Sequence, residues 1–428
     1  MVSGFILKIK NTKMEFRDYQ KLIITQGLQV LQKYKFLYLA MEVRTGKTLT
    51  SMGLCHRILN HSQKTPKVLF LTKKKAISSI EADYDLLKPS FDLHVINYES
   101  MHKLPVILWD AVIIDEAHGL GAFPKPSKRA KDVKELLRIS RNAYVILMSG
   151  TPTPESYSQM YHQVYGIPMN PFAEHKNFYS FCKRYVDVFQ KKLSSLMVND
   201  YSRGREEILR KMKPYTINYS QKDAGFITKT NEEILTVPID KYTADVIRLL
   251  KKNLVVEGKE EVVLADTAVK LMMKLHQLYS GTVKFESGNS TVLNYNKANF
   301  IRKQFGTKKI AIFYKFKEEL NAIKKIFGDS VCTDLYTFDH TNKNIALQIV
   351  SGREGISLRN AEALVYYNID FSATSYWQSR DRMTTKERKY NKIYWVFSEG
   401  GIEYKIYKAV LKKKDYTLNH FKRDLLDL

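Results

Sequence analysis

Cysteines, long apolar runs and acidic residues are all scarce in this chain of 428 residues. Its three cysteines, Cys55, Cys182 and Cys332, lie far apart and form no C-x-x-C pair, which argues against a disulfide framework or a structural zinc site. The start of the chain lacks the apolar segment and cleavage site of a signal peptide, and no apolar run approaches the ~18 residues of a membrane span. The sequence therefore predicts a protein of the reducing cytoplasm that binds no membrane.

The shortage of acidic residues leaves a large positive charge. Lys and Arg number 69 against 44 Asp and Glu, a net charge of +25. Such an excess indicates a polyanionic partner, which is a nucleic acid, an anionic membrane or an acidic protein. A lysine-rich protein without such a partner is the alternative. The apolar fraction of 44% excludes a mainly disordered chain, and ~150 residues per domain predicts two or three domains.

Short apolar runs recur in the first ~150 residues and again in the second half of the chain. They predict an α/β fold with parallel strands that are buried on both faces. A change of texture between them predicts three parts, namely a first lobe (1–155), a helical insert with the crossing to the next lobe (156–225), and a second lobe that starts and ends with helices (226–428). Strands are expected at 36–41, 68–72, 94–97, 111–114, 143–148, 233–237, 309–314, 345–350, 363–368 and 392–397, and helices at 157–164, 176–188, 205–213, 265–280 and 403–414.

One stretch of the insert is rich in basic and aromatic residues. Residues 183–213 hold nine Lys or Arg and four Asp or Glu, with Tyr185, Phe189 and Tyr201 between them. The pattern is compatible with a solvated helical insert and with a surface that faces phosphates.

A phosphate-binding loop is predicted where the first strand ends. Gly46-Lys47-Thr48 follows an apolar run and opens an expected helix. Gly46 lets the backbone close around phosphates, Lys47 supplies a positive charge, and the hydroxyl of Thr48 suits Mg²⁺. The usual pattern has glycine where Met41 stands, so the match is partial, and a chance loop is the alternative.

Two carboxylates follow another buried strand. Asp115 and Glu116 stand at the end of the run 111–114, where open α/β sheets bind their ligands. Asp115 suits Mg²⁺, Glu116 suits the orientation or deprotonation of water, and His118 suits coupling to a neighbouring loop. An ordinary acidic strand end is the alternative, but a phosphate loop upstream favours phosphoryl transfer.

Asp115-Glu116-Ala117-His118, a DEAH box, and Ser149-Gly150-Thr151-Pro152 resemble motifs of superfamily 2 helicases. Further segments between about residues 14 and 415 resemble, in the same order along the chain, motifs of the Swi/Snf-type double-stranded DNA translocases. They narrow the resemblance to that family. They are Phe16–Gln20 (L-R-x-Y-Q), Val95–Glu99 (I-x-x-Y-E), Phe178–Val186 (F-x-x-R-F), Lys213–Ile217 (R-P-F-x-L), Leu271–Gly281 (L-x-x-L-R-Q-x-x-x-G), Ile310–Phe316 (V-L-I-F-x-x-F), Gly355–Leu358 (G-x-N-L), Asn368–Phe371 (D-P-x-W), Gln378–Arg382 (Q-A-x-x-R) and the final helix from Gly401.

The resemblance implies two RecA-like lobes that hold ATP and Mg²⁺, with a helical insertion after the third motif, and that bind double-stranded or branched DNA. It assigns ATP binding to Arg17, Gln20 (which reads adenine), Val43, Arg44, Thr45, Gly46, Lys47 and Thr48, and Mg²⁺ binding to Thr48 and Asp115. Catalysis falls to Lys47, Asp115, Glu116 and Arg382. The resemblance assigns the coupling of the ATP site to neighbouring loops to His118, Ser149, Thr151, Gly355 and Gln378. DNA contacts fall to Thr72, Lys73, Tyr98, Gly150, Ser351, Gly352 and Arg353, although Tyr98 is equally compatible with a core position.

The chain departs from the family pattern in its phosphate loop, its second lobe and its sixth motif. Met41 replaces an acidic residue or glycine, and the stretch between Phe327 and Asn344 is short. Thr385 stands where the arginine finger is expected, a group that elsewhere contributes ~10³–10⁵ in rate. Three alternatives are open: Arg380 or Arg388 replaces that arginine, Arg382 does the work alone, or turnover is slow.

The resemblance leaves three functions open. The first is a translocase that acts on branched or protein-bound DNA in replication, recombination or repair. The second is a helicase that separates strands of forks, R-loops or RNA, for which the sequence identifies no wedge hairpin. The third is an ATP-gated DNA-binding protein with little turnover. The compact architecture suggests a monomeric, phage-encoded enzyme of the host cytoplasm, recruited by another protein.

Overall fold

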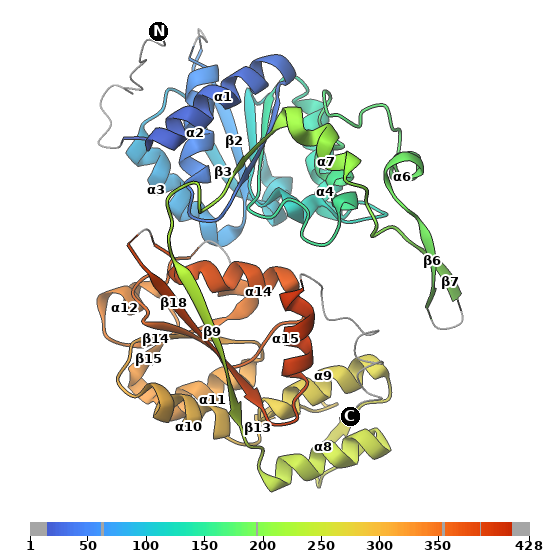
Figure 1. Cartoon of the computed structure of the whole chain (residues 1–428), viewed down its shortest axis with the longest axis vertical. Coiled ribbons are helices and arrows are strands. Elements are labelled where there is room, and N and C mark those ends of the chain that lie inside the picture. The colour runs from blue at the N-terminus through green and yellow to red at the C-terminus, as the bar shows by residue number, and fades with distance from the viewer. Residues whose placement is uncertain (1–14, 61–63, 194–195, 353–355, 386, 413–428) are drawn as a thin grey trace. The chain divides into compact units, whose positions relative to one another are not determined.

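Two six-stranded parallel sheets, one in each of two compact units, organise the chain (Figure 1). The structure is a computed structural model that describes residues 15–60, 64–193, 196–352, 356–385 and 387–412. The units divide between Gly225 and Phe226. The predicted α/β class with two parallel-sheet lobes is confirmed.

The sheet of unit 1 has helices on both faces. Along β1 (Phe36–Met41), Phe36 and Tyr38 belong to the same apolar core as residues of α4 (Lys128–Ile139), α5 (Met160–Val164) and α6 (Phe178–Tyr185). Leu37 and Leu39 belong to the core formed with α1 (Asp18–Tyr34), α2 (Lys47–Ile58) and α3 (Ile77–Leu87). Burial on both faces is why these strands are continuous apolar runs. The strand order is β3 (Asp92–Asn97), β2 (Lys67–Thr72), β4 (Ala111–Ile114), β5 (Tyr144–Met148), β1 (Phe36–Met41) and β8 (Thr216–Tyr219). The helices on the sheet are α1 (Asp18–Tyr34), α2 (Lys47–Ile58), α3 (Ile77–Leu87) and α4 (Lys128–Ile139).

The insert of unit 1 combines helices with a hairpin that the sequence did not predict. The expected helix 176–188 is shorter, and the residues after it form two antiparallel strands, because apolar and aromatic residues that favour strands flank a Ser-Ser pair. The elements are α5 (Met160–Val164), α6 (Phe178–Tyr185), β6 (Phe189–Leu193), β7 (Leu196–Asp200) and α7 (Glu207–Met212).

The sheet of unit 2 repeats the parallel arrangement. Its order is β15 (Val331–Cys332), β16 (Asn344–Gln348), β14 (Ile310–Tyr314), β17 (Ala363–Tyr366), β18 (Tyr390–Ser398) and β9 (Lys229–Val237). Its helices are α8 (Lys241–Asn253), α9 (Ala268–Tyr279), α10 (Asn296–Phe305), α11 (Lys317–Phe327), α12 (Leu335–His340), α13 (Ile349–Gly352), α14 (Ala373–Ser379) and α15 (Glu403–Leu411). Two small hairpins, β10 (Val255–Glu257) with β11 (Val262–Leu264) and β12 (Thr282–Lys284) with β13 (Ser290–Val292), complete it.

The predicted boundaries in unit 2 need small corrections. The expected strand 233–237 begins at Lys229, because β9 pairs along the whole of β18. The expected strand 345–350 ends at Gln348, and the next residues form α13. The short stretch before β16 still accommodates β15 and α12.

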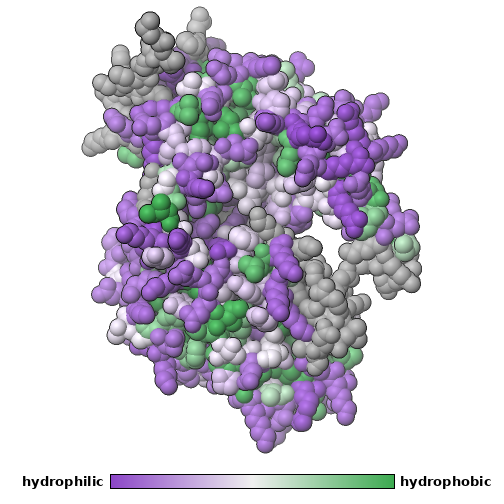
Figure 2. Space-filling view, viewed as in Figure 1, coloured by the Kyte–Doolittle hydropathy of each residue, from purple (hydrophilic) through white to green (hydrophobic). Residues whose placement is uncertain are grey.

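Short 3₁₀ helices connect many of these elements, at η1 (Lys74–Ala76), η2 (Tyr98–Lys103), η3 (Ala117–Leu120), η4 (Tyr157–Gln159), η5 (Lys213–Tyr215), η6 (Gly328–Ser330) and η7 (Arg380–Met383). Hydrophilic side chains cover much of the face in Figure 2, and apolar ones form separate patches. Among the described residues, no helix is long and apolar enough to cross a membrane.

Candidate active site

The loop between β1 and α2 curls around a space in front of the helix N-terminus. Gly46 adopts a left-handed conformation, with φ at 79°, immediately before Lys47 begins α2. A Cβ atom at Gly46 would lie 2.5 Å from Nε2 of Gln20. Both the φ angle and the close approach therefore require glycine here. The first amides of α2 lack partners within the helix and point outward, as phosphate binding needs.

The amine of Lys47 lies inside this loop. Its Nζ donates to the carbonyl oxygens of Met41, at 2.9 Å, and Glu42, at 3.2 Å. Thr45 holds the loop closed, because its hydroxyl donates to the carbonyl of Glu42 at 2.7 Å. Phosphate oxygens accept stronger, charge-assisted hydrogen bonds from an ammonium group than carbonyls do.

Helix α1 braces one side of the loop. The buried Gln20 donates from Nε2 to the carbonyl of Gly46, at 3.3 Å, and to the hydroxyl of Thr50, at 3.4 Å. Its Oε1 accepts from the backbone N–H of Arg17 at 2.9 Å. Tyr19 donates to the carbonyl of Thr45 at 3.0 Å. The Gln20 amide thus holds the loop in this structure, and its reading of adenine stays a prediction.

The segment that follows β8 braces the other side, which the sequence did not suggest. The backbone N–H of Glu42 donates to the carbonyl of Tyr219 at 2.9 Å. The backbone N–H of Gln221 donates to the Glu42 carboxylate at 2.7 Å, and the Gln221 side chain donates to the carbonyl of Val43 at 3.1 Å. Tyr219 also stacks on Tyr19, with 4.8 Å between ring centroids. No motif signals this contact, since 178 residues separate Gln221 from Val43.

The acidic pair lies at the end of β4 with its two carboxylates in different surroundings. Asp115 accepts from the hydroxyl of Thr72 at 2.9 Å. Burial, and next the charge of Glu116, raise the pKa of Asp115. Burial opposes ionisation of Glu116 too, but His118 and the two nearby cations, Lys47 and Lys73, outweigh it and lower its pKa. Glu116 is therefore the first of the pair to ionise.

A chain of polar contacts joins Glu116 to the segment 149–152, the third of the helicase-like motifs. Nδ1 of His118 lies 3.3 Å from the Glu116 carboxylate and 3.0 Å from the hydroxyl oxygen of Ser149. That oxygen also accepts from the backbone N–H of Thr151 at 3.1 Å. A Cβ atom at Gly150 would lie 3.4 Å from the backbone nitrogen of Val43. The structure therefore brings the predicted coupling residues of unit 1 together beside the phosphate loop.

Several of the predicted DNA contacts are buried or half-buried, and their contact with DNA stays a prediction. Thr72 is fully buried on Asp115, and Tyr98 is 5% exposed, with its hydroxyl on the Asp115 carbonyl. Gly150 lies against the phosphate loop, and Gly352 is buried where a Cβ atom would meet Phe313 at 2.7 Å. Lys73 and Ser351 are both half-buried and stay candidates for DNA contact. Arg353 and Gly355 lie outside the described residues.

The three candidate arginines all bind within unit 2. Arg382 is 7% exposed and donates from Nε to the carbonyl of Gln378 at 2.9 Å. Arg380 forms an ion pair with Glu232, and its guanidinium lies 4.8 Å from the ring centroid of Trp377. Arg388 donates to the carbonyl of Ala361 at 2.6 Å.

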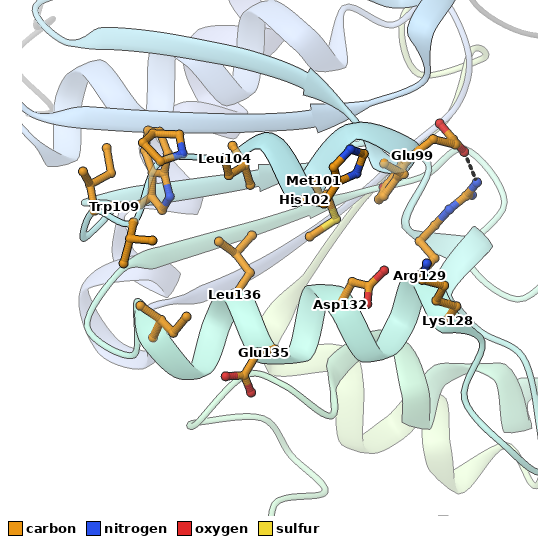
Figure 3. A pocket seen from close by; sticks show the side chains of 15 residues that line it. Glu99, Met101, His102, Leu104, Trp109, Lys128, Arg129, Asp132, Glu135 and Leu136 are labelled. Atoms are coloured by element: carbon orange, nitrogen blue, oxygen red, sulfur yellow. Dashed lines mark hydrogen bonds and ion pairs between the residues drawn. The ribbon is translucent and has the colours of Figure 1, made fainter.

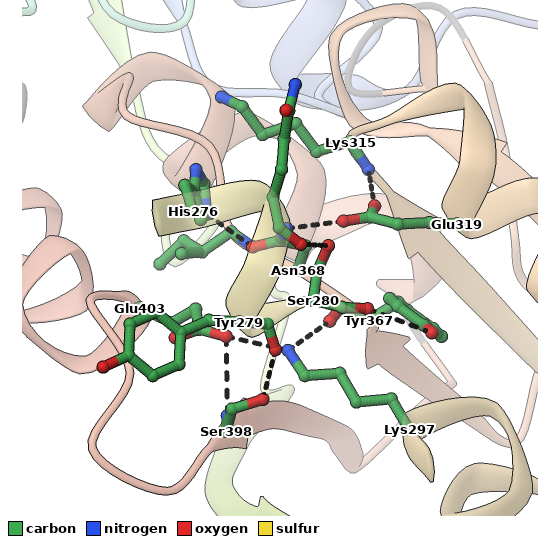
Figure 4. Close-up of polar contacts among 12 residues, drawn as sticks. His276, Tyr279, Ser280, Lys297, Lys315, Glu319, Tyr367, Asn368, Ser398 and Glu403 are labelled. Atoms are coloured by element: carbon green, nitrogen blue, oxygen red, sulfur yellow. Dashed lines mark hydrogen bonds and ion pairs between the residues drawn. The ribbon is translucent and has the colours of Figure 1, made fainter. Parts of the chain in front are cut away.

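A buried polar network supports the motif segments of unit 2 (Figure 4). His276 on α9 lies 2.6 Å from Oδ1 of Asn368, and Asn368 donates to Glu319 on α11 at 2.6 Å. Lys297 and Glu403 form a buried ion pair at 2.8 Å. Burial, together with the charge of Lys315, lowers the pKa of His276 well below its usual value, so this histidine is neutral.

A separate cavity of about 600 Å³ lies between η2 and α4 of unit 1. Figure 3 shows Glu99, paired with Arg129 at 2.8 Å, at one end and Trp109 at the other. None of the phosphate-loop residues lines it. The cavity therefore does not belong to the nucleotide site.

The residues fit a divalent cation only together with a bound phosphate. Within the described ranges, no group of three or more His, Cys, Asp and Glu side chains could hold a metal ion. Asp115 offers a carboxylate oxygen. Burial, and next the charge of Glu116, disfavour ionisation of this carboxyl group. Such a carboxylate suits Mg²⁺, which protein sites hold through one or two carboxylates plus substrate phosphates.

The chain matches two family profiles. The SNF2-related domain matches residues 55–282, and the type III restriction enzyme res subunit matches residues 13–84, which include the phosphate loop. No curated protein sequence matches the chain.

Three solved structures are similar at low sequence identity. The Sulfolobus solfataricus SWI2/SNF2 ATPase core in complex with dsDNA is 16% identical, with a TM-score of 0.44, over 96% of this chain and 93% of that chain. The Sulfolobus solfataricus SWI2/SNF2 ATPase core domain is 17% identical, with a TM-score of 0.41, over 96% and 91%. The Pyrococcus furiosus Hef helicase domain is 14% identical, with a TM-score of 0.49, over 92% and 97%. Because the SNF2-related profile spans more than half of the 428 residues, the chain belongs to the SNF2-related domain family of helicase-like ATPases.

Proposed function

We propose that this protein is an ATP-dependent, Mg²⁺-requiring translocase on double-stranded DNA. The observation that carries the proposal is the chain of contacts from Glu116 through His118 to Ser149. The next residue, Gly150, lies against the phosphate loop. A hydrolytic carboxylate that is linked to a neighbouring loop allows the state of the nucleotide to change the conformation of that loop.

Each residue of the site has a distinct task in this proposal. The amides at the start of α2 and the amine of Lys47 bind the β and γ phosphates. Thr48 and Asp115 would hold Mg²⁺, which neutralises charge on the phosphates. Glu116 is ionised, since its pKa is lowered, and its carboxylate accepts a hydrogen bond from the attacking water. An arginine of unit 2 completes the charge stabilisation, and Arg380, Arg382 and Arg388 are the candidates.

The net charge of +25 supports a DNA partner that is bound through its phosphates. Phosphate contacts carry no sequence information, so the proposal predicts binding without sequence preference and with a strong dependence on salt. Branched or protein-bound DNA in replication, recombination or repair is the proposed setting. A monomeric phage enzyme with a DEAH box, acting in the host cytoplasm and recruited by another protein, completes the proposal.

The proposal is tested by steady-state ATP hydrolysis without nucleic acid and with duplex DNA, branched DNA, single-stranded DNA or RNA, at two salt concentrations. Glu116→Gln sets the background, and Lys47→Ala tests the phosphate loop. Stimulation by duplex or branched DNA that falls at higher salt supports the translocase. Preferential stimulation by single strands or RNA favours a helicase, and tight binding without turnover favours an ATP-gated binding protein. Unchanged DNA-stimulated hydrolysis in Lys47→Ala refutes the assigned site.

A further inference from the structure

The β6–β7 hairpin extends away from the rest of unit 1 (Figure 1). Its strands pair from Phe189 with Asp200 to Leu193 with Leu196, and they form a sheet of two strands only. The pairing continues toward the helices, where Val186 pairs with Gly204. Isolated two-stranded ribbons are marginally stable in water, so a ribbon in this position needs support at its base or a partner along its length.

The base of the hairpin is firmly anchored. Tyr201 packs against Phe178 and Tyr179 of α6, with ring centroids 5.7 Å and 5.9 Å apart. The hydroxyl of Ser158 donates to the carbonyl of Tyr201 at 2.6 Å. The backbone N–H of Asp187 donates to the carbonyl of Arg203 at 2.9 Å. These contacts hold the direction of the ribbon at its base.

Apolar side chains are exposed on both faces of the ribbon. Val188 is 44% exposed, Met197 56% and Val198 37%. Because strand residues alternate between faces and Phe189 pairs with Asp200, Val188 and Met197 share one face, and Phe189 and Val198 share the other. A protruding element with apolar groups on both faces is suited to insertion between two surfaces that it covers.

The charge around the hairpin identifies the kind of partner. Residues 183–213 carry nine basic and four acidic side chains, and Arg203 is exposed. The Arg203 guanidinium lies 3.9 Å from the centroid of the Phe189 ring, a flat cationic surface next to an aromatic one. A nucleic acid with unpaired bases offers both an anionic backbone and flat apolar faces, whereas an intact duplex hides its bases.

We propose that the β6–β7 hairpin recognises branch points in DNA by contacting unpaired bases with Val188, Met197, Phe189 and Arg203. The inference rests on the proposed function and deepens it, because it selects branched DNA among the possible substrates. A branch point presents two diverging strands, and the apolar groups on the two faces of the ribbon lie between them. Arg203 and Arg205, both exposed at the base of the ribbon, bind the flanking phosphates.

The test compares two hairpin variants with matched controls on α7. Met197→Ser removes an exposed apolar group and Arg203→Ala removes the cation over Phe189. Leu209→Ser and Arg210→Ala make the same changes at exposed positions outside the ribbon. Fluorescence anisotropy measures the affinity for a three-way branched DNA and for a blunt duplex of equal length, and thermal unfolding checks each fold.

We expect each hairpin variant to lose about tenfold in affinity for branched DNA, within the range that stacking on a base contributes. The affinity of the hairpin variants for blunt duplex and the affinities of both controls should change less than twofold. Equal losses on the two DNAs would mean a general phosphate contact and overturn the inference. Unchanged affinity for branched DNA in both hairpin variants would overturn it too, and a partner protein would then be the occupant to test.

This outcome is separable from that of the proposed function. If the wild-type protein shows no DNA-stimulated ATP hydrolysis but the hairpin variants lose branch affinity, the translocase fails and the hairpin inference stands. If hydrolysis is stimulated by DNA and the hairpin variants bind branched DNA as the wild type does, the translocase stands and the hairpin inference fails.

Discussion

Gln221→Ala tests whether the phosphate loop communicates with the chain that leads out of unit 1. The substitution removes the hydrogen bond from the Gln221 side chain to the carbonyl of Val43, which is 3.1 Å long. It leaves the backbone N–H of Gln221 free to keep its bond to the Glu42 carboxylate. Gln221 stands only a few residues before the division between the two units at Gly225. A rearrangement of the loop around a nucleotide can therefore reach the connecting segment through this bond, in addition to the two bonds of Glu42.

The magnitude follows from one partly exposed hydrogen bond. Such a bond contributes ~0.5–1.5 kcal/mol net, so its loss shifts an equilibrium between two loop states by about fivefold. The same loss lowers the melting temperature by only about 2–4 °C in a unit of this size. We expect Gln221→Ala to fold normally and to lose about fivefold in the ratio of DNA-stimulated to basal ATP hydrolysis.

The assay is steady-state ATP hydrolysis at saturating nucleotide, with and without duplex DNA. Lys222→Ala, a change at the exposed neighbouring position, is the matched control and should keep the wild-type ratio. A wild-type ratio in Gln221→Ala would refute the reasoning, because the bond would then be equally present in every state of the cycle. An equal fall in basal and stimulated rates would also refute it, since that result indicates a damaged site rather than lost communication.

Three further predictions follow from single sites. Glu116→Gln should lower hydrolysis by ~10²–10⁴-fold while ATP binding persists, because the amide can still accept a hydrogen bond from the water but has neither the negative charge nor the basicity of the ionised carboxylate. Loss of binding in a nucleotide titration would contradict this. Gly46→Ala should cost at least ~1–3 kcal/mol and abolish nucleotide binding, since φ is 79° and the new Cβ meets Gln20; denaturant unfolding checks the first effect and a wild-type midpoint would disprove it. His276 should make the free energy of unfolding fall as the pH drops below ~6.5, because the unfolded chain then takes up a proton that the neutral, buried imidazole of the folded state does not. His276→Gln should flatten that dependence in thermal unfolding from pH 8 to pH 5, and an unchanged pH profile would exclude this role of His276.

The burial of Thr72 and Tyr98 shows why a sequence motif alone does not identify a DNA contact. Thr72 is the last residue of β2 and Tyr98 directly follows β3, positions where a contact to a ligand is plausible. The same strand ends also surround Asp115, and both hydroxyls donate to that residue. A short polar motif is compatible with contact to a ligand and with support of the residue that contacts it, and only burial distinguishes the two.

The sequence by itself determined the parallel sheets and the phosphate loop. Strands 36–41 and 111–114 match the structure at both ends, because a parallel strand that is covered on both faces must be an uninterrupted apolar run. The loop was predictable because the positive φ of Gly46 and the helix start at Lys47 are local requirements. These features depend on neighbours in the chain.

Tertiary structure alone decided which distant residues surround the loop. Gln221 reaches Val43 across 178 residues, and no local pattern encodes that approach. The strands around Phe189 and Val198 are too short to give a periodic signal, and the ring contact of Tyr201 with Phe178 at their base joins residues 23 positions apart. The three arginines of unit 2 are likewise held by backbone carbonyls or by Glu232. Contacts between distant segments depend on how the whole chain packs, which sequence motifs do not record.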